Sequence, residues 1–199
     1  MIKVEKIVVG QLRTNCYLVW EEESNEGVII DPGDDGEYLI EKINQLGFSP
    51  KFILATHGHF DHILAVTELK LVFNIPFLIH QKDLFLLKRA SQSAKFFTGI
   101  NPEPILPPDK FLEEGQEIVF QKEKIKVLFT PGHTPGSVSF LAENFLFSGD
   151  LIFADGVGRT DFSYSSYKDL EKSIKRIFLL PPQTIIFPGH GEEFGIKKA

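Results

Sequence analysis

One seven-residue segment concentrates side chains that bind metals. It reads Thr56-His57-Gly58-His59-Phe60-Asp61-His62 and holds three imidazoles and one carboxylate. Neutral imidazole and carboxylate are the ligand set of zinc, iron or manganese. Three histidines clustered directly after a buried strand would lower the stability of the fold, through mutual repulsion or loss of hydration, unless something bound them. The segment therefore predicts a metal site rather than three structural histidines.

Three later segments each present one more ligand-type side chain next to a glycine. They are Thr130-Pro131-Gly132-His133-Thr134-Pro135-Gly136, Phe147-Ser148-Gly149-Asp150 and Phe187-Pro188-Gly189-His190-Gly191. Each follows or completes an apolar run that we expect to be a strand, and rigid strands position the loops where ligands gather. Alone, each of these side chains would more often be structural. Together with the first segment they indicate one metal centre. The sixth histidine, His80, is expected to be a non-ligand bonded near a helix start.

The elements that must hold these loops can be located from the apolar pattern. Strands are expected at residues 3–9, 16–20, 28–30, 52–55, 76–79, 117–121, 125–129, 138–142, 145–148 and 184–187. Helices are expected at residues 37–46, 61–74, 83–90 and 167–179. Residues 91–109 contain four prolines, which predicts an irregular loop of the kind that covers a cleft. The hairpin-like strand runs with interleaved helices favour two mixed sheets packed face to face, with helices outside.

Composition narrows the class of protein. The chain has 199 residues, 43% of them hydrophobic, which predicts a single domain over residues 1–199. A net charge of −6 disfavours nucleic-acid binding. Cys16 is the single cysteine and is expected in the core, so no intrachain disulfide forms, which fits a reducing compartment. No run approaches the roughly 20 apolar residues of a membrane span. We expect a soluble cytoplasmic protein, either monomer or homodimer, that does not bind membranes.

The chain resembles the metallo-β-lactamase superfamily, whose pattern is HxHxDH followed by a later His, a later Asp and a final His. The resemblance covers nearly the whole chain and implies an α/β fold, the four-layer αββα sandwich. Within the superfamily the chain is most similar to glyoxalase II-like (hydroxyacylglutathione hydrolase-like) proteins, through residues 130–137 and 148–153. The segment Gly158-Arg159-Thr160-Asp161-Phe162 is similar to a short subgroup of these proteins.

The resemblance implies a role for each candidate residue. One divalent metal would be held by His57, His59 and His133. The other would be held by Asp61, His62 and His190, with Asp150 bridging the two; Asp61 and Asp150 are also the expected catalytic carboxylates. Zinc is the expected metal, with iron and manganese as alternatives. Asp31 would either orient a ligand histidine or simply form the turn before Pro32.

The implied activity is hydrolysis of a small-molecule thioester, S-lactoylglutathione or a related acyl thiol, by a hydroxide that bridges two metals. Two features depart from glyoxalase II. That enzyme carries a C-terminal helical domain for glutathione, whereas this sequence has nine residues after His190. Arg159 matches a basic residue of the family and is expected either to hold an anionic group of the substrate or to form a surface salt bridge, but Asp161 stands where the family has a tyrosine.

Other functions remain open for the same ligand set. A persulfide dioxygenase-like enzyme would need a single iron, which His57, His133 and Asp150 could hold. Lactone or β-lactam hydrolysis also suits such a centre. A non-catalytic metal or redox module is the non-enzyme alternative, although such proteins usually rely on an attached flavin domain. Nuclease activity is disfavoured by the acidic charge and the lack of a long basic insertion.

Overall fold

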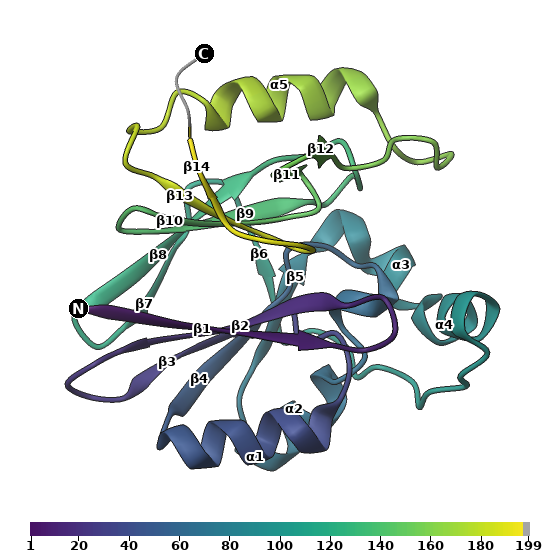
Figure 1. The fold of residues 1–199 in the computed structure, drawn as a ribbon. Coiled ribbons are helices and arrows are strands. Elements are labelled where there is room, and N and C mark those ends of the chain that lie inside the picture. Colours follow the sequence, from purple (N-terminus) through teal and green to yellow (C-terminus); the bar gives the residue numbers. More distant parts are fainter. Residues whose placement is uncertain (197–199) are drawn as a thin grey trace.

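Apolar side chains alternate between two cores along the central strands. In one strand, Val28 and Ile30 face the core between two sheets, whereas Ile29 faces a second core beneath helices. Successive side chains of a strand point to opposite faces, so a strand that is apolar at every position must be covered on both sides. The computed structural model, which describes residues 1–196, accordingly shows two sheets packed face to face with helices on the outside (Figure 1).

The first sheet has six strands in the order β1-β2-β3-β4-β5-β6. Its strands are β1 (Ile2–Val9), β2 (Thr14–Glu21), β3 (Glu26–Ile30), β4 (Ser49–Leu54), β5 (Phe77–His80) and β6 (Lys110–Leu112). The first two pairings are antiparallel and the last three are parallel. β3 and β4 therefore end at the same edge of the sheet, which matters for the loops that follow them.

The second sheet also has six strands, in the order β14-β13-β10-β9-β8-β7. They are β7 (Glu117–Phe120), β8 (Glu123–Phe129), β9 (Val138–Ala142), β10 (Phe145–Gly149), β13 (Ile185–Pro188) and β14 (Phe194–Gly195). A separate hairpin joins β11 (Ile152–Phe153) to β12 (Gly156–Val157). β10 and β13 run parallel, and β8 shares their direction because two antiparallel pairings separate it from β10. The three strands thus end at one edge.

Helices cover the outer face of each sheet. The helices are α1 (Gly36–Leu46), α2 (Val66–Phe73), α3 (Leu84–Leu87), α4 (Ala90–Thr98) and α5 (Tyr167–Ile177), with single 3-10 turns at Phe60–His62 and Gln81–Asp83. In Figure 1, α1 and α2 lie under the first sheet and α5 lies over the second, which completes the expected four-layer αββα sandwich. Ser166 caps α5 by accepting a hydrogen bond from the Asp169 amide.

The expected helix over residues 61–74 is wrong at its start. The chain makes a 3-10 turn at Phe60–His62 and only then enters α2 at Val66. The amides of Leu64 and Ala65 donate to the carbonyls of Gly33 and Pro32 instead of to a preceding helical turn. Asp61 is therefore not the first residue of a long helix, and its side chain is directed by a loop packed against the segment after β3.

Residues 91–109 are also not wholly irregular, because α4 occupies Ala90–Thr98. The prolines that suggested a loop all follow Gly99, which ends the helix with a φ of 75°. The expected helix over residues 83–90 is likewise divided, into α3 and the start of α4. The short strands β6, β11, β12 and β14 were not predicted. No helix among residues 1–196 is long and apolar enough to cross a membrane.

Candidate metal centre

All the predicted ligand loops leave strands at the edges just described. Asp31 and His57 follow the parallel neighbours β3 and β4, whereas Asp150 and His190 follow the parallel neighbours β10 and β13. His133 follows β8, which runs in the direction of β10. Because the two sheets face each other, these loops converge from both halves of the chain onto one cluster.

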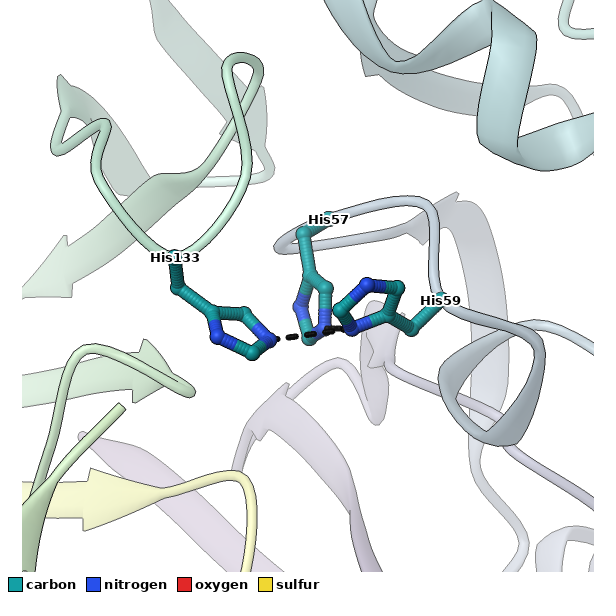
Figure 2. A group of neighbouring side chains, drawn as sticks. All are labelled: His57, His59 and His133. Atoms are coloured by element: carbon teal, nitrogen blue, oxygen red, sulfur yellow. Dashed lines mark hydrogen bonds between the residues drawn. The ribbon is translucent and has the colours of Figure 1, made fainter. Parts of the chain in front are cut away.

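The first part of the cluster consists of His57, His59 and His133, drawn in Figure 2. Nδ1 of His59 lies 3.1 Å from Nε2 of His57 and 2.9 Å from Nε2 of His133. The first two side chains come from the loop after β4 and the third comes from the facing loop after β8 (Figure 2). One nitrogen from each ring thus points at a common centre, which is the arrangement that three imidazole ligands need.

The second part of the cluster consists of Asp61, His62 and His190. Oδ2 of Asp61 lies 3.6 Å from Nε2 of His62 and 3.4 Å from Nε2 of His190. The side chain of His62 is fully buried, whereas that of His190 is 28% exposed. This group is therefore one carboxylate and two imidazoles on the more open side of the cluster.

Asp150 lies between the two groups. Its Oδ2 is 3.5 Å from Nε2 of His133, and its Oδ1 is 3.5 Å from Nε2 of His62 and 3.7 Å from Nε2 of His190. One carboxylate oxygen thus faces each group. Gly189 makes room for this carboxylate, because a Cβ there would collide with Oδ1 of Asp150 and lie 2.8 Å from the ring of His62.

Hydrogen bonds on the outer side of the rings fix which nitrogen faces the centre. Nδ1 of His62 lies 3.0 Å from the Asp31 carboxylate, and Nδ1 of His133 lies 2.9 Å from the Arg159 carbonyl. Carboxylate and carbonyl oxygens only accept, so each Nδ1 carries the proton and donates. Nε2 is then left free on the inner side, as a metal ligand requires.

Asp31 connects the ligand histidines through hydrogen bonds on the side away from the centre of the cluster. Its carboxylate accepts hydrogen bonds from the Thr56 amide at 2.7 Å and the Thr56 hydroxyl at 2.6 Å, besides that from His62. The Thr56 hydroxyl can then accept from Nδ1 of His57 at 3.0 Å. Asp31 is 1% exposed and has a φ of 50°, so it also forms the turn before Pro32. The two interpretations of Asp31 are compatible, because one residue makes both sets of contacts.

The chemistry of the cluster fits a bound cation. Nε2 of His62 and Oδ1 of Asp150 are both buried and have no hydrogen-bond partner in the described chain. An unsatisfied buried polar atom costs about 1–3 kcal/mol, so a partner outside the protein is expected. In the protein alone, the Asp61 and Asp150 carboxylates outweigh burial and raise the pKa of His62 to about 10; a bound cation would take the place of the proton that Nε2 carries there. Burial and the neighbouring imidazole of His133 lower the pKa of His59 to about 3, which keeps that ring in its neutral, metal-binding form.

Sequence reasoning missed Asp83, which ties two ligand loops together. Its buried carboxylate accepts from the Gly58 amide at 2.8 Å, the Gly136 amide at 2.7 Å and the Thr134 hydroxyl at 2.7 Å. The first donor lies between His57 and His59, and the other two come from the residues that follow His133. In the sequence Asp83 resembles an ordinary helix-capping residue, so no signal distinguishes it.

A second residue missed from the sequence is Tyr164. Its hydroxyl lies 2.9 Å from Nε2 of His59, and its ring stacks on Phe162 with the centroids 5.2 Å apart. Asp161 had suggested that this region lacks the tyrosine of the family. In the structure a tyrosine does lie beside the cluster, but it is Tyr164, three residues after Asp161. The spacing of residues in the sequence does not reveal this offset.

Four members of the cluster, His59, Asp61, His133 and Asp150, form the floor of a pocket with a volume of about 260 Å³. Its wall is largely apolar: Leu12, Phe60, Leu86, Phe97, Phe162 and Tyr164. Arg159 also lines the pocket, where its guanidinium makes two hydrogen bonds to Asp161, at 2.7 and 2.6 Å. Arg159 was expected either to hold an anionic group of the substrate or to form a surface salt bridge, and in the structure it forms the salt bridge.

Two residues expected to be uninvolved lie away from the pocket. His80 stacks on Phe129, and its Nδ1 accepts a hydrogen bond from the Lys82 amide at the start of a 3-10 turn. Cys16 is fully buried in the core between the first sheet and its helices, and burial raises the pKa of its thiol well above the ordinary value. Neither residue is placed to act on a molecule in the pocket.

Comparison with known proteins places this geometry in a family. The model of the metallo-beta-lactamase superfamily matches residues 9–190, a range that contains every predicted ligand. Hydroxyacylglutathione hydrolase GloC of Haemophilus influenzae is 37% identical over 96% of this chain and 91% of its own length. The probable metallo-hydrolase YqgX of Bacillus subtilis is 33% identical over 96% and 92%.

Solved structures agree with the sequence relatives. TTHA1623 in a di-iron-bound form superposes with a TM-score of 0.89 at 38% identity, over 97% of this chain and 95% of that one. The BLEG-1 B3 metallo-beta-lactamase superposes with a TM-score of 0.90 at 37% identity, over 98% and 94%. With its fold, its ligand pattern and these relatives, the chain belongs to the metallo-β-lactamase superfamily.

Proposed function

We propose that this protein is a metal-dependent hydrolase that cleaves an acyl thioester, S-lactoylglutathione or a related compound. The observation that carries the proposal is the position of Asp150, whose two oxygens face two separate groups of ligands at the floor of a pocket. The similarity to a protein named hydroxyacylglutathione hydrolase supports the thioester as substrate. A sequestered floor beneath an apolar wall suits a hydrolase that must orient a small substrate.

The proposed ligands divide into two sets around Asp150. His57, His59 and His133 would hold one cation, and Asp61, His62 and His190 the other. We propose zinc because nitrogen and carboxylate oxygen ligands suit it. Iron has the same ligand preferences, and a neighbour at 38% identity is described in a di-iron-bound form, so metal analysis must decide between them.

When bound, two such cations supply Lewis acidity that lowers the pKa of a water molecule and polarises the substrate carbonyl. The chain's own residues would orient the reactants. The Thr14 hydroxyl donates to Oδ2 of Asp61 at 3.1 Å, which leaves Oδ1 of Asp61 to accept a hydrogen bond from the attacking water. Addition of the water oxygen to the carbonyl carbon and cleavage of the carbon–sulfur bond then yield a carboxylic acid and a thiol, with the proton that the water loses going to the departing sulfur. Cys16 is fully buried and takes no part.

The test is hydrolysis of S-lactoylglutathione by zinc-reconstituted protein, followed as thiol release. We expect turnover that is abolished by Asp150→Asn and retained by His80→Asn, a matched change of a histidine outside the cluster. The asparagine in the second variant can still cap the Lys82 amide. Absence of thiol release from every acyl thioester tried, on protein that contains two metals, would overturn the proposal.

A second candidate is β-lactam hydrolysis. It is favoured by the match to a structure described as a B3 metallo-beta-lactamase, at 37% identity over 98% of this chain. A chromogenic cephalosporin assayed beside S-lactoylglutathione on the same sample separates the two activities. Oxygen consumption with glutathione persulfide belongs in the same panel, because it would reveal the mononuclear iron alternative instead.

A further inference from the structure

We propose that the pocket selects acyl thioesters whose thiol portion is apolar and uncharged, and that Asp161 sets this selectivity by occupying Arg159. The inference rests on the proposed thioesterase function and names the substrate class for it. It follows from three features of the pocket. Its rim is apolar and exposed, its one arginine is hydrogen-bonded to an aspartate, and the hydroxyl of its aromatic wall is hydrogen-bonded to a histidine of the cluster.

The rim of the pocket exposes large apolar side chains. Phe97 is 58% exposed and Leu12 is 45% exposed, although both line the pocket. The Phe97 ring stacks on Phe60 at a centroid distance of 6.0 Å and an interplanar angle of 10°, so it extends an apolar surface from the buried floor outward. Contiguous exposed apolar surface at a pocket mouth indicates an apolar ligand.

The aromatic wall offers little to an anionic ligand. Phe162 and Tyr164 stack nearly in parallel, with an interplanar angle of 10°. The Tyr164 hydroxyl faces Nε2 of His59 at 2.9 Å, so the polar end of this pocket-lining side chain is directed to the cluster. An apolar group beside these rings would bury further aromatic surface.

Arg159 is the one lysine or arginine among the described residues that line the pocket. Its guanidinium is held in a two-point hydrogen bond by Asp161 and lies 4.4 Å from the centroid of the Phe162 ring. The hydrogen bond from Arg159 lowers the pKa of Asp161 to about 2, so the carboxylate remains charged at neutral pH. The pair presents no net charge to the pocket.

A glutathione thioester carries two carboxylates and one ammonium group. A carboxylate that approached Arg159 would have to displace Asp161 or lie beside its negative charge. Arg89 also acts electrostatically on Tyr164, but it is not among the lining residues. A thioester with an uncharged thiol portion meets no such competition, and it gains contact with the apolar rim.

The experiment compares two thioesters with the same lactoyl group, S-lactoylglutathione and the lactoyl thioester of benzyl mercaptan. We expect a higher kcat/KM for the benzyl thioester, by about tenfold or more. Asp161→Asn frees Arg159 and should raise kcat/KM for S-lactoylglutathione by about fivefold, the size of effect that one exposed ion pair can supply. It should leave the benzyl thioester within about twofold.

Asp155→Asn is the matched control, since it removes one exposed carboxylate nearby on the chain without touching Arg159. It changes the net charge by the same amount, so an equal gain in this variant would mean that overall charge, not Asp161, is responsible. Arg89→Gln tests the other nearby cation and should leave the gain from Asp161→Asn intact. Phe97→Ser should raise KM for the benzyl thioester selectively.

Binding provides a readout that is independent of turnover. The non-hydrolysable thioethers S-benzylglutathione and S-benzyl-N-acetylcysteamine share their benzyl group, and calorimetry should show tighter binding of the uncharged one. Preference for the glutathione compounds in the wild-type protein, with no gain from Asp161→Asn, would overturn the inference and leave the thioesterase intact. If protein that contains two metals hydrolyses neither these two nor any other acyl thioester, the thioesterase proposal falls, and the calorimetric comparison then shows only whether the pocket prefers the uncharged ligand.

Discussion

The floor and the rim of the pocket are built in opposite ways. At the floor, the lining residues rest on His57 and His62, which are fully buried, and Asp31 fixes His62 directly and His57 through Thr56. At the rim, Phe97 is 58% exposed and the Arg159–Asp161 pair has side chains that are 58% and 65% exposed. The side chains at the floor are thus held by many mutually dependent contacts, whereas those at the rim are held by a few independent contacts.

This difference separates chemistry from selectivity. A buried polar network loses much of its stability when one member changes, because the remaining partners are left unsatisfied. Exposed side chains away from such networks usually change stability by less than about 0.5 kcal/mol. The floor can therefore keep one reaction type while the rim varies in the substrates that it admits. Substitutions on the two sides should differ in kind as well as in size.

The largest effect is expected from Asp150→Asn. The amide has one oxygen where the carboxylate has two, so it cannot serve both ligand groups with an anionic oxygen. We expect loss of bound metal and a fall in thioester turnover of at least about a hundredfold. Mutating a residue that only hydrogen-bonds to a metal ligand costs up to about a hundredfold, and a change to a ligand itself should cost at least as much. Metal analysis by mass spectrometry and the thiol-release assay measure the two effects. Full metal content with full turnover would remove Asp150 from its proposed place.

A smaller but still clear effect is expected from Asp31→Asn. The change retains the shape of the side chain, but its NH₂ group cannot accept from the Thr56 hydroxyl or the His62 ring. Metal affinity should fall by roughly 10–100-fold, as for other partners of ligand histidines. Competition with a chelator of known affinity measures this. Unchanged affinity would indicate that Asp31 is only a turn residue.

Asp83→Ala should act on stability and loop geometry. It leaves the amides of Gly58 and Gly136 without their acceptor in a buried site, which costs about 1–3 kcal/mol for each unsatisfied group. Denaturant unfolding of the metal-free protein measures the loss without interference from bound metal. A variant as stable as the wild type would show that water replaces the carboxylate and that the two loops do not depend on it.

The smallest expected effect is the loss of stability when an exposed ion pair is removed. Glu114→Gln removes an ion pair to Arg176 on α5, which at this exposure is worth at most about 1 kcal/mol. The hydrogen bond from Arg176 lowers the pKa of Glu114 below its ordinary value of 4.5, so the pair stabilises the fold above that pH. The stability difference between the variant and the wild type should therefore be present at neutral pH and disappear as the pH falls through the lowered pKa. A difference that grew on acidification would contradict this.

The floor was largely predictable from the sequence, for a physical reason. Its candidate ligands are residue types that bind metals, most of them lie beside glycines, and they follow apolar runs that must be strands. The ends of the strands then bring His133, Asp150 and His190 close to the first motif, whereas the division of these residues into two sets around Asp150 was implied by the family resemblance. The long helices were also predictable where a cap is clear, as for α1, which ends at Gly47 with a φ of 65°.

The rim was less predictable, because its contacts depend on short irregular segments. Proline density suggested a loop over residues 91–109, yet the eight residues before Gly99 lack helix breakers and form most of α4, which supplies Phe97. The position of Tyr164 depends on the path of the loop after β12, which no periodicity describes. Asp83 was missed for a related reason, since its partners are backbone amides that leave no trace in the sequence.

The central claim is that two cations share the floor through Asp150, and metal stoichiometry with location tests it most directly. Protein reconstituted with excess zinc or iron and freed of loose metal should contain two ions per chain. Anomalous diffraction from crystals of that sample should place one ion among His57, His59 and His133 and the other among Asp61, His62 and His190. A single iron held by His57, His133 and Asp150, with the other ligands unused, would contradict the account and favour oxygenase chemistry.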